Sequence, residues 1–465
     1  MNFNSIFNFQ TKNINTNALI LGVSYFFSAL LGLFRDRLLA GKFGAGMQLD
    51  VYFAAFRVPD FVYNILILGG LTIAFLPLFS EYFSKDKKEA WRMTNYLLNT
   101  FLFFLILISL ILFIVTPWLV PWIFPGFGKE AIKLAIPLTR LLFLSPIFFG
   151  ISNLFSGILH YFNRFFIYSL APILYNLGII FGILVLSPRF GIFGVGLGVI
   201  FGAFLHMLIQ IPSAISCGFN YKFLFNFKYP ALKRIFNLMM PRVFGVAAQQ
   251  INLIVIVAIA STITAGSIAI FNFSNNLQGL AAGMVGVSFA VAIFPVLSRT
   301  FAQNQKEEFL QNFSLAFRRI LLFIIPISIL LFLLRTQIVA LIYKTGKFNI
   351  EDVQLTSACL GLFAFSIFAQ SLIPLLARGF FSFQDTKTPT LVSIFIITLN
   401  IILAFFFTQI LSSPGPFSNS LGDFFGLEVN KKTSVIGLPL AFSLTAIFQF
   451  ILLFFSFRKK IKSTL

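Results

Sequence analysis

Arg35, Asp36 and Arg37 stand at the end of a long apolar stretch, and Arg57 lies within the next one. A charge at membrane depth costs several kcal/mol, so one that persists usually faces a cavity or a partner. The planar arginine fork forms two parallel charge-assisted hydrogen bonds with a phosphate. These residues therefore predict a cationic wall that binds an anionic ligand. Snorkelling of the first three side chains at the outer membrane interface is the alternative.

Other polar residues within apolar stretches extend this candidate site. We interpret Asp36 and Asp50 as groups that orient the arginines or hold a cation, and an ion pair with Asp50 or Asp60 is the alternative role of Arg57. Arg242 follows Pro241 and precedes a polar series on one helical face. Hydrogen bonding between helices explains that series equally well. The remaining candidates are two amides, Asn275 and Asn276, with Arg140 and Arg378 as supporting cations.

Composition predicts an all-α polytopic membrane protein. The chain of 465 residues is 58% hydrophobic and 10% charged, with a mean hydropathy of +0.94. A spanning helix needs about 20 apolar residues. We count about twelve such stretches, centred near residues 27, 66, 106, 147, 177, 203, 251, 283, 328, 366, 400 and 446.

The formal net charge of +20 is a topology signal. On the twelve-helix map, a majority of the Lys and Arg residues fall in segments on the side of the N-terminus, which the positive-inside rule assigns to the cytoplasm. Both termini are therefore expected in the cytoplasm, and no nucleic acid is expected as a partner. The first 18 residues contain no cleavage pattern, so the first span is expected to serve as the insertion signal.

The sequence contains two copies of a six-helix unit. Residues 74–83 resemble 292–301, and residues 157–164 occupy the place of 379–385, with similar spacing both times. An even number of helices gives parallel repeats, and substrate sites then lie between the halves. The predicted organisation is an N-lobe (1–216, helices 1–6), a cytoplasmic linker (217–234) and a C-lobe (235–465, helices 7–12).

Enzyme signatures are absent from the sequence. The only histidines, His160 and His206, have no carboxylate or thiol at ligand spacing, and there is no Walker-type loop. Cys217 and Cys359 give neither a metal spacing nor a disulfide pattern. We therefore expect a transporter without catalytic residues, metal or cofactor, driven by a coupling ion or by the membrane potential.

Several motifs together resemble the MurJ (MviN) family of lipid II flippases, in the MOP exporter superfamily. The matching segments are Gly32–Asp36, Phe43–Gly46, Asp50–Pro59, Ala74–Ser80, Asn163–Phe165, Ala171–Pro172, Pro241–Asn252, Phe294–Ser298, Tyr343–Phe348 and Ala377–Pro389. The resemblance covers nearly the whole chain, and Ala377–Pro389 is its most specific part. It implies a MATE-like, V-shaped bundle that works by alternating access, with cavity arginines holding a lipid-linked pyrophosphate.

On this sequence the family's cavity motif is matched at Arg35, Asp50 and Arg57. The chain also departs from the family. Ala29, Tyr63 and Asn276 stand where well-known members have cavity arginines, and Leu68 stands where an acidic residue is usual. Many members also carry two further C-terminal helices that form a groove for the lipid tail.

The resemblance implies a bacterial inner-membrane flippase for lipid II, the peptidoglycan precursor linked to undecaprenyl pyrophosphate. It implies membrane lipids as surroundings and a monomer, with cell-wall synthesis machinery as a candidate partner. The alternatives are an exporter of another lipid-linked oligosaccharide or of an amphiphilic drug, and a non-transporting cell-wall scaffold.

Overall fold

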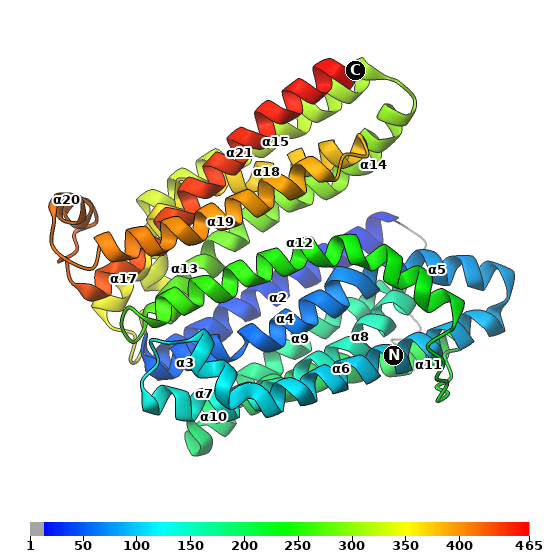
Figure 1. Ribbon diagram of the computed structural model, residues 1–465, viewed down its shortest axis with the longest axis horizontal. Coiled ribbons are helices and arrows are strands. Elements are labelled where there is room, and N and C mark those ends of the chain that lie inside the picture. The colour runs from blue at the N-terminus through cyan, green and yellow to red at the C-terminus, as the bar shows by residue number, and fades with distance from the viewer. Residues whose placement is uncertain (1–13, 465) are drawn as a thin grey trace. The chain divides into compact units, whose positions relative to one another are not determined.

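Helices make up every element of the structure in the residues that it describes. The computed structural model describes residues 14–464, and a few side chains within this range, including those of Leu68 and Arg242, lie outside the description. The chain divides into two compact units (Figure 1). Unit 1 comprises Met1–Leu39 and Val51–Ile254, and unit 2 comprises Ala40–Asp50 and Val255–Leu465.

Unit 1 contains the first six predicted spans and part of the seventh. Its helices are α2 (Ile14–Phe43, up to Leu39), the later part of α3 (Met47–Ala55), α4 (Arg57–Tyr63), the π-helix η1 (Asn64–Leu71), α5 (Thr72–Lys85), α6 (Lys87–Ile123), α7 (Lys129–Leu142), α8 (Leu144–Tyr161), α9 (Phe165–Phe181), the π-helix η2 (Gly182–Leu186), α10 (Ser187–Leu208), α11 (Ile211–Ser216) and α12 (Pro230–Ser261, up to Ile254).

Unit 2 contains the remaining helices and the short segment of residues 40–50. Its helices are α13 (Ser267–Ala282), the π-helix η3 (Gly283–Val287), α14 (Ser288–Ala302), α15 (Lys306–Leu333), α16 (Arg335–Tyr343), α17 (Ile350–Ala364), α18 (Ile367–Ser382), α19 (Lys387–Ile410), α20 (Pro416–Phe425), the 3₁₀ helix η4 (Lys431–Ile436) and α21 (Gly437–Thr464). The chain passes between the units after residues 39, 50 and 254. The lobe boundaries drawn from the sequence stay a prediction.

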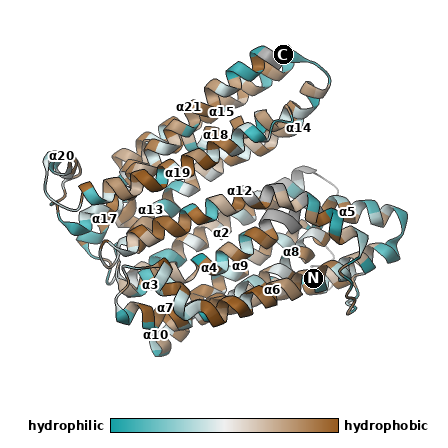
Figure 2. Ribbon diagram, in the orientation of Figure 1, coloured by the Kyte–Doolittle hydropathy of each residue, from teal (hydrophilic) through white to brown (hydrophobic). Residues whose placement is uncertain are grey.

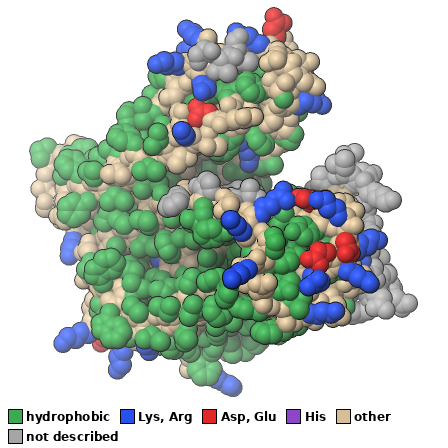
Figure 3. Space-filling view, turned by 45° about the vertical axis from the view of Figure 1, so that its right-hand side comes forward, with side chains coloured by type: hydrophobic (Ala, Val, Ile, Leu, Met, Phe, Trp, Pro, Cys, Tyr) green, Lys and Arg blue, Asp and Glu red, His purple; other side chains and the backbone are tan. Residues whose placement is uncertain are grey.

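The expected all-α polytopic architecture is confirmed. Among the described residues, eight helices are long and apolar enough to cross a membrane, or nine if the pair α17 and α18, bent by 45°, is one span. Eleven of the twelve predicted centres fall within a helix, and the twelfth, residue 366, lies at the bend between α17 and α18. Hydrophobic residues occupy the bodies of the helices and hydrophilic residues their ends (Figure 2). Apolar side chains cover the visible surface between gatherings of Lys and Arg (Figure 3).

The continuous helical stretch Phe165–Ser216 folds back on itself. Its 52 residues would extend for about 78 Å if straight, far more than the roughly 30 Å of a bilayer core. Gly191, with φ 57°, reverses the chain. Beyond the turn Gly198 lies against Gly182, where an added Cβ would meet a backbone Cα at 2.6 Å. This one stretch therefore holds the fifth and sixth predicted spans.

The two copies that the sequence predicts share local backbone irregularities. A π-helix interrupts the second helical segment in one copy (η1) and its counterpart in the other (η3). α8 and α18 end in the same cap, in which Asn163 and Gln384 adopt left-handed conformations at φ 54° and 58°. In both caps the next backbone N–H donates to the carbonyl five residues earlier, from Arg164 to Leu159 and from Asp385 to Phe380.

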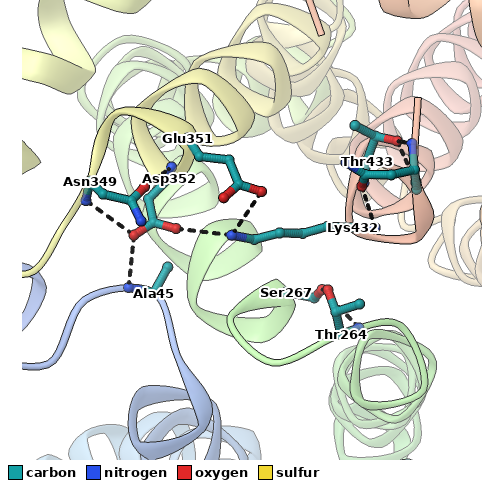
Figure 4. Close-up of polar contacts among 9 residues, drawn as sticks. Ala45, Thr264, Ser267, Asn349, Glu351, Asp352, Lys432 and Thr433 are labelled. Carbon is teal, nitrogen blue, oxygen red and sulfur yellow. Dashed lines mark hydrogen bonds and ion pairs between the residues drawn. The ribbon is translucent and has the colours of Figure 1, made fainter. Parts of the chain in front are cut away.

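One end of unit 2 is joined by backbone and carboxylate contacts. The Lys347 N–H donates to the Gly41 carbonyl at 2.8 Å. Asp352, in the capping box of α17, accepts from the Ala45 N–H at 3.4 Å and from Lys432 Nζ at 3.4 Å (Figure 4). Lys432 also pairs with Glu351 at 3.2 Å. These contacts fix the segment of residues 40–50 to the rest of unit 2.

We predict that Gly346→Ala destabilises this end of unit 2. Gly346 has φ 53°, and a Cβ there would clash with the Gly41 carbonyl oxygen. A strained left-handed residue costs about 1–3 kcal/mol, so thermal unfolding of the purified protein in detergent should begin at a lower temperature. Gly279→Ala is the control, because nothing lies within 4 Å of its added Cβ. Equal unfolding temperatures for both variants would contradict the prediction.

Candidate functional site

Arg35 is held inside unit 1 by two partners. Its Nε and Nη2 donate to Asp36 Oδ1 at 2.9 and 2.7 Å, and its Nη1 donates to Asn176 Oδ1 of α9 at 3.0 Å. The Asp36 side chain is buried, whereas 22% of the Arg35 side chain is exposed. A guanidinium has five N–H donors, so these three bonds leave two N–H groups, one on each Nη. The structure thus combines a fixed cation with donors that remain available.

Asn176 is a residue of this cluster that the sequence did not single out. Its Nδ2 donates to the carbonyl and the hydroxyl of Ser28 on α2, both at 3.3 Å, and to the Pro172 carbonyl at 3.2 Å. Its oxygen is left for Arg35. The sequence feature that could have indicated Asn176 is an amide within an apolar helix, because such a group must find partners within the protein.

Arg57 begins α4 immediately after a break in the helix at Phe56. Asp60 follows three residues later, in the first turn of α4. The side-chain amide of Asn64 donates to the Asp60 carbonyl at 2.7 Å, where α4 passes into the π-helix η1. Of the two acids considered as partners of Arg57, Asp60 lies on the same helix, three residues away.

Asp50 caps a helix that lies far away in the sequence. Its Oδ2 accepts from the Gly266 N–H at 2.6 Å and its Oδ1 from the Ala269 N–H at 2.9 Å. These groups belong to the first turn of α13, where N–H groups lack partners within the helix and favour a negative charge. Asp50 is 3% exposed. In this structure both of its oxygens serve the start of α13.

Asn275 and Asn276 lie half-buried on α13 of unit 2. The Asn275 Oδ1 accepts from Gln278 Nε2 at 3.0 Å. Other polar side chains of α13 bond to the carbonyls of their own helix, as Asn272 does to Ile268 at 2.7 Å. Much of the hydrogen bonding of the polar side chains of α13 is therefore local.

The supporting arginines satisfy carbonyls where helices are irregular. Pro117 cannot donate to the carbonyl of Phe113, four residues earlier. Arg140 Nε donates to that carbonyl at 3.0 Å, and its guanidinium carbon lies 4.7 Å from the centroid of the Phe113 ring. Arg378 Nη1 donates to the carbonyl of Val287, the last residue of η3, at 3.4 Å.

The remaining positions named from the sequence include Arg37, Arg242 and Tyr63. Arg37 is half-buried in α2, and because residues two apart in a helix do not face each other, it does not share the face of Arg35. The Arg242 side chain lies outside the described residues. At one position where the family carries a cation, the Tyr63 hydroxyl accepts from Asn153 Nδ2 at 3.1 Å. Among the described residues no three His, Cys, Asp or Glu are grouped to hold a metal ion.

Solved structures of known proteins place the fold in a transporter class. A structure described as "Lipid II flippase MurJ, inward closed conformation" matches with a TM-score of 0.78 and 26% identity, over 96% of this chain and 90% of that one. An inward-facing MATE-family transporter of the MOP superfamily matches with a TM-score of 0.71 and 16% identity, over 94% and 95% of the two chains. The chain thus shares the fold of this flippase and of a MATE-family transporter.

Sequence comparisons identify the family. The family model described as "Lipid II flippase MurJ" matches residues 39–465. A probable lipid II flippase MurJ of Buchnera aphidicola subsp. Schizaphis graminum is 30% identical over 415 residues, covering 86% of this chain and 77% of that protein. The lipid II flippase MurJ of Burkholderia cenocepacia is 26% identical over 399 residues, covering 83% and 77%. The chain belongs to the MurJ lipid II flippase family.

We predict that Asp50→Ala lowers the stability of the protein by about 1–2 kcal/mol, the usual effect of removing a helix cap. Asp50→Asn should have a smaller effect, because one oxygen is kept. Thermal unfolding in detergent measures both, with Glu428→Ala, an exposed acid of unit 2, as the control. If Asp50→Ala unfolds like the unmodified protein yet fails to transport, Asp50 acts on the ligand rather than on α13.

Proposed function

We propose that this protein moves lipid II, the peptidoglycan precursor carried on undecaprenyl pyrophosphate, from the cytoplasmic to the outer leaflet of the bacterial inner membrane. Family membership supports the substrate class. The observation that carries the mechanism is the state of Arg35, which is held by Asp36 and Asn176 and keeps one N–H on each Nη. An N–H group on each Nη can donate to oxygens of a phosphate.

In the proposed cycle, the cavity first opens to the cytoplasm and takes the lipid headgroup. Arg35 binds the pyrophosphate, and Arg57 adds a second positive charge. The prenyl tail stays in the lipid, and the two lobes then rock so that the headgroup is exposed outside. The membrane potential supplies energy, because moving one charge through 100 mV is worth about 2.3 kcal/mol. The protein acts as a transporter and carries out no covalent chemistry.

The proposal includes the topology and the partners expected from the sequence. Both termini lie in the cytoplasm, as the distribution of Lys and Arg indicates. The protein works as a monomer surrounded by membrane lipids, and it takes the lipid-linked precursor as its substrate. Cell-wall synthesis enzymes, which consume the flipped precursor, are the natural neighbours.

A second candidate substrate is another lipid-linked oligosaccharide. The hydroxyl of Tyr63, bonded to Asn153, replaces a family cation by a neutral group, and Ala29 and Asn276 are likewise neutral. A site with fewer cations suits a ligand with less charge, such as a saccharide linked through a monophosphate. Competition between lipids of the two kinds in the assay below separates these substrates.

We predict that Arg35→Ala abolishes flipping while the protein still inserts in the membrane. The measurement is lipid II exposed in the outer leaflet of spheroplasts depleted of their own flippase and expressing the variant at a matched level. Arg35→Lys should retain only a small part of the activity, because an ammonium keeps the charge and loses the planar fork. Arg189→Gln, which removes an exposed arginine of α10, is the control. Normal exposure with Arg35→Ala would refute the proposal.

We further predict that Asn176→Leu weakens lipid II binding about tenfold. A hydrogen bond to a charged group is worth about 1.5–3 kcal/mol, and its loss frees the Arg35 side chain to leave its position. Ser28→Ala is the matched control, because it removes another bond of Asn176 and leaves the bond to Arg35. Affinity for lipid II is measured by titration of the purified variants. Equal affinities for the two variants would show that Asn176 acts only in packing.

A further inference from the structure

An apolar groove lies within unit 1, apart from the residues assigned to flipping. Its volume is about 650 Å³, within the roughly 300–1,000 Å³ usual for ligand pockets. One wall is a face of α6 that includes Phe104 and Ile108, and the other is the beginning of α12, with Leu232 and Met239. From Thr100 to Ile108 this groove extends about 12 Å along α6 at 1.5 Å per residue.

The segment between α11 and α12 closes one end of the groove and is firmly attached to α6. The amide of Asn99 donates to the carbonyls of Lys222 and Leu224, both at 3.0 Å. The Tyr229 hydroxyl donates to Glu89 at 2.7 Å, and its ring stacks on Tyr96 with centroids 4.5 Å apart. The groove is therefore formed before any ligand arrives.

Two lysines stand at this end of the groove. Lys228 and Lys233 line it and are exposed. In the part of the chain that the structure describes, no acidic side chain lies within ion-pair distance of either lysine, whereas the neighbouring Arg234 pairs with Glu81 at 2.6 Å. The groove thus joins an apolar interior to a cationic rim.

A buried hydroxyl in the groove also points to a ligand. Thr100 lines the groove and is 5% exposed, and its Oγ1 has no hydrogen-bond partner among the described residues. A buried hydroxyl without a partner is unfavourable, so a ligand oxygen that accepts from Thr100 would be stabilising.

A cluster of aromatic side chains lies beside the groove. Phe103, Phe104, Phe225 and Phe227 form a cluster in which the Phe225 and Phe227 centroids are 4.6 Å apart. All four rings are substantially exposed. Exposed apolar rings beside lysines offer contacts to both the acyl chains and the charged headgroup of a lipid.

We propose that this groove binds one anionic glycerophospholipid of the cytoplasmic leaflet. The phosphate lies between Lys228 and Lys233, an ester carbonyl accepts from the Thr100 hydroxyl, and an acyl chain follows α6 past Phe104 towards Ile108. Charge complementarity identifies the occupant, because basic pockets on the cytoplasmic side favour anionic headgroups. The site uses none of the residues proposed to bind lipid II, and it does not depend on that function.

The test is native mass spectrometry of the full-length protein titrated with phosphatidylglycerol or phosphatidylcholine of the same acyl chains. The unmodified protein should prefer phosphatidylglycerol. Each lysine near a phosphate contributes about fivefold in affinity, so the double variant Lys228→Gln/Lys233→Gln should lose at least tenfold of the preference. Thr100→Val should weaken binding of both lipids by about three- to tenfold.

The control is Lys459→Gln/Lys462→Gln, which removes two exposed lysines of α21 and should leave the preference within twofold. Leu232→Trp, which fills the groove, should reduce binding of both lipids while the protein remains folded in a thermal scan. Equal binding of the two lipids to the unmodified protein would overturn the proposal. It would equally fail if the preference survived in the Lys228 and Lys233 variant, or if these lysines governed binding of a polyprenyl pyrophosphate lipid and not of phosphatidylglycerol.

Discussion

Within hydrocarbon, every polar group must find its partner in the protein itself, and the polar residues of this chain are arranged by that requirement. The proline at position 117 deprives one carbonyl of its donor, and Arg140 supplies another. The first turn of α13 presents N–H groups without acceptors, and Asp50 accepts from two of them. Charges that look functional in the sequence are here largely components of the backbone's hydrogen bonding.

Arg35 differs from these residues because its partners do not use all of its donors. Asp36 compensates the charge, so the arginine can stay in an apolar setting, and Asn176 fixes the direction of the guanidinium. Two N–H groups remain for a ligand. A group held in advance loses little conformational freedom when the ligand binds. This combination of neutralisation and spare donors is the reason why Arg35 is proposed as the ligand-binding cation.

The helices could be predicted from the sequence because long apolar stretches in a membrane protein admit no other structure. The repeats could also be predicted, and the shared π-helices and left-handed caps extend the likeness to the backbone. The partners of individual charges could not be predicted from the sequence. Asp50 meets the start of α13 across 216 residues, and Arg35 meets Asn176 across 141. Residue type shows that such groups need partners, but only the packing of helices determines which.

Neutral residues stand at positions where well-known family members carry arginines, and this affects how many buried charges need compensation. At position 63 the tyrosine hydroxyl bonds to Asn153 and keeps a polar surface without a charge to compensate. Since each buried charge is costly, fewer arginines need fewer acids, which fits the leucine at position 68, where the resemblance leads one to expect an acidic residue. The electrostatic work of holding a pyrophosphate then falls on the cations that remain. Arg35 is a cation whose side chain is both held by two partners and partly exposed.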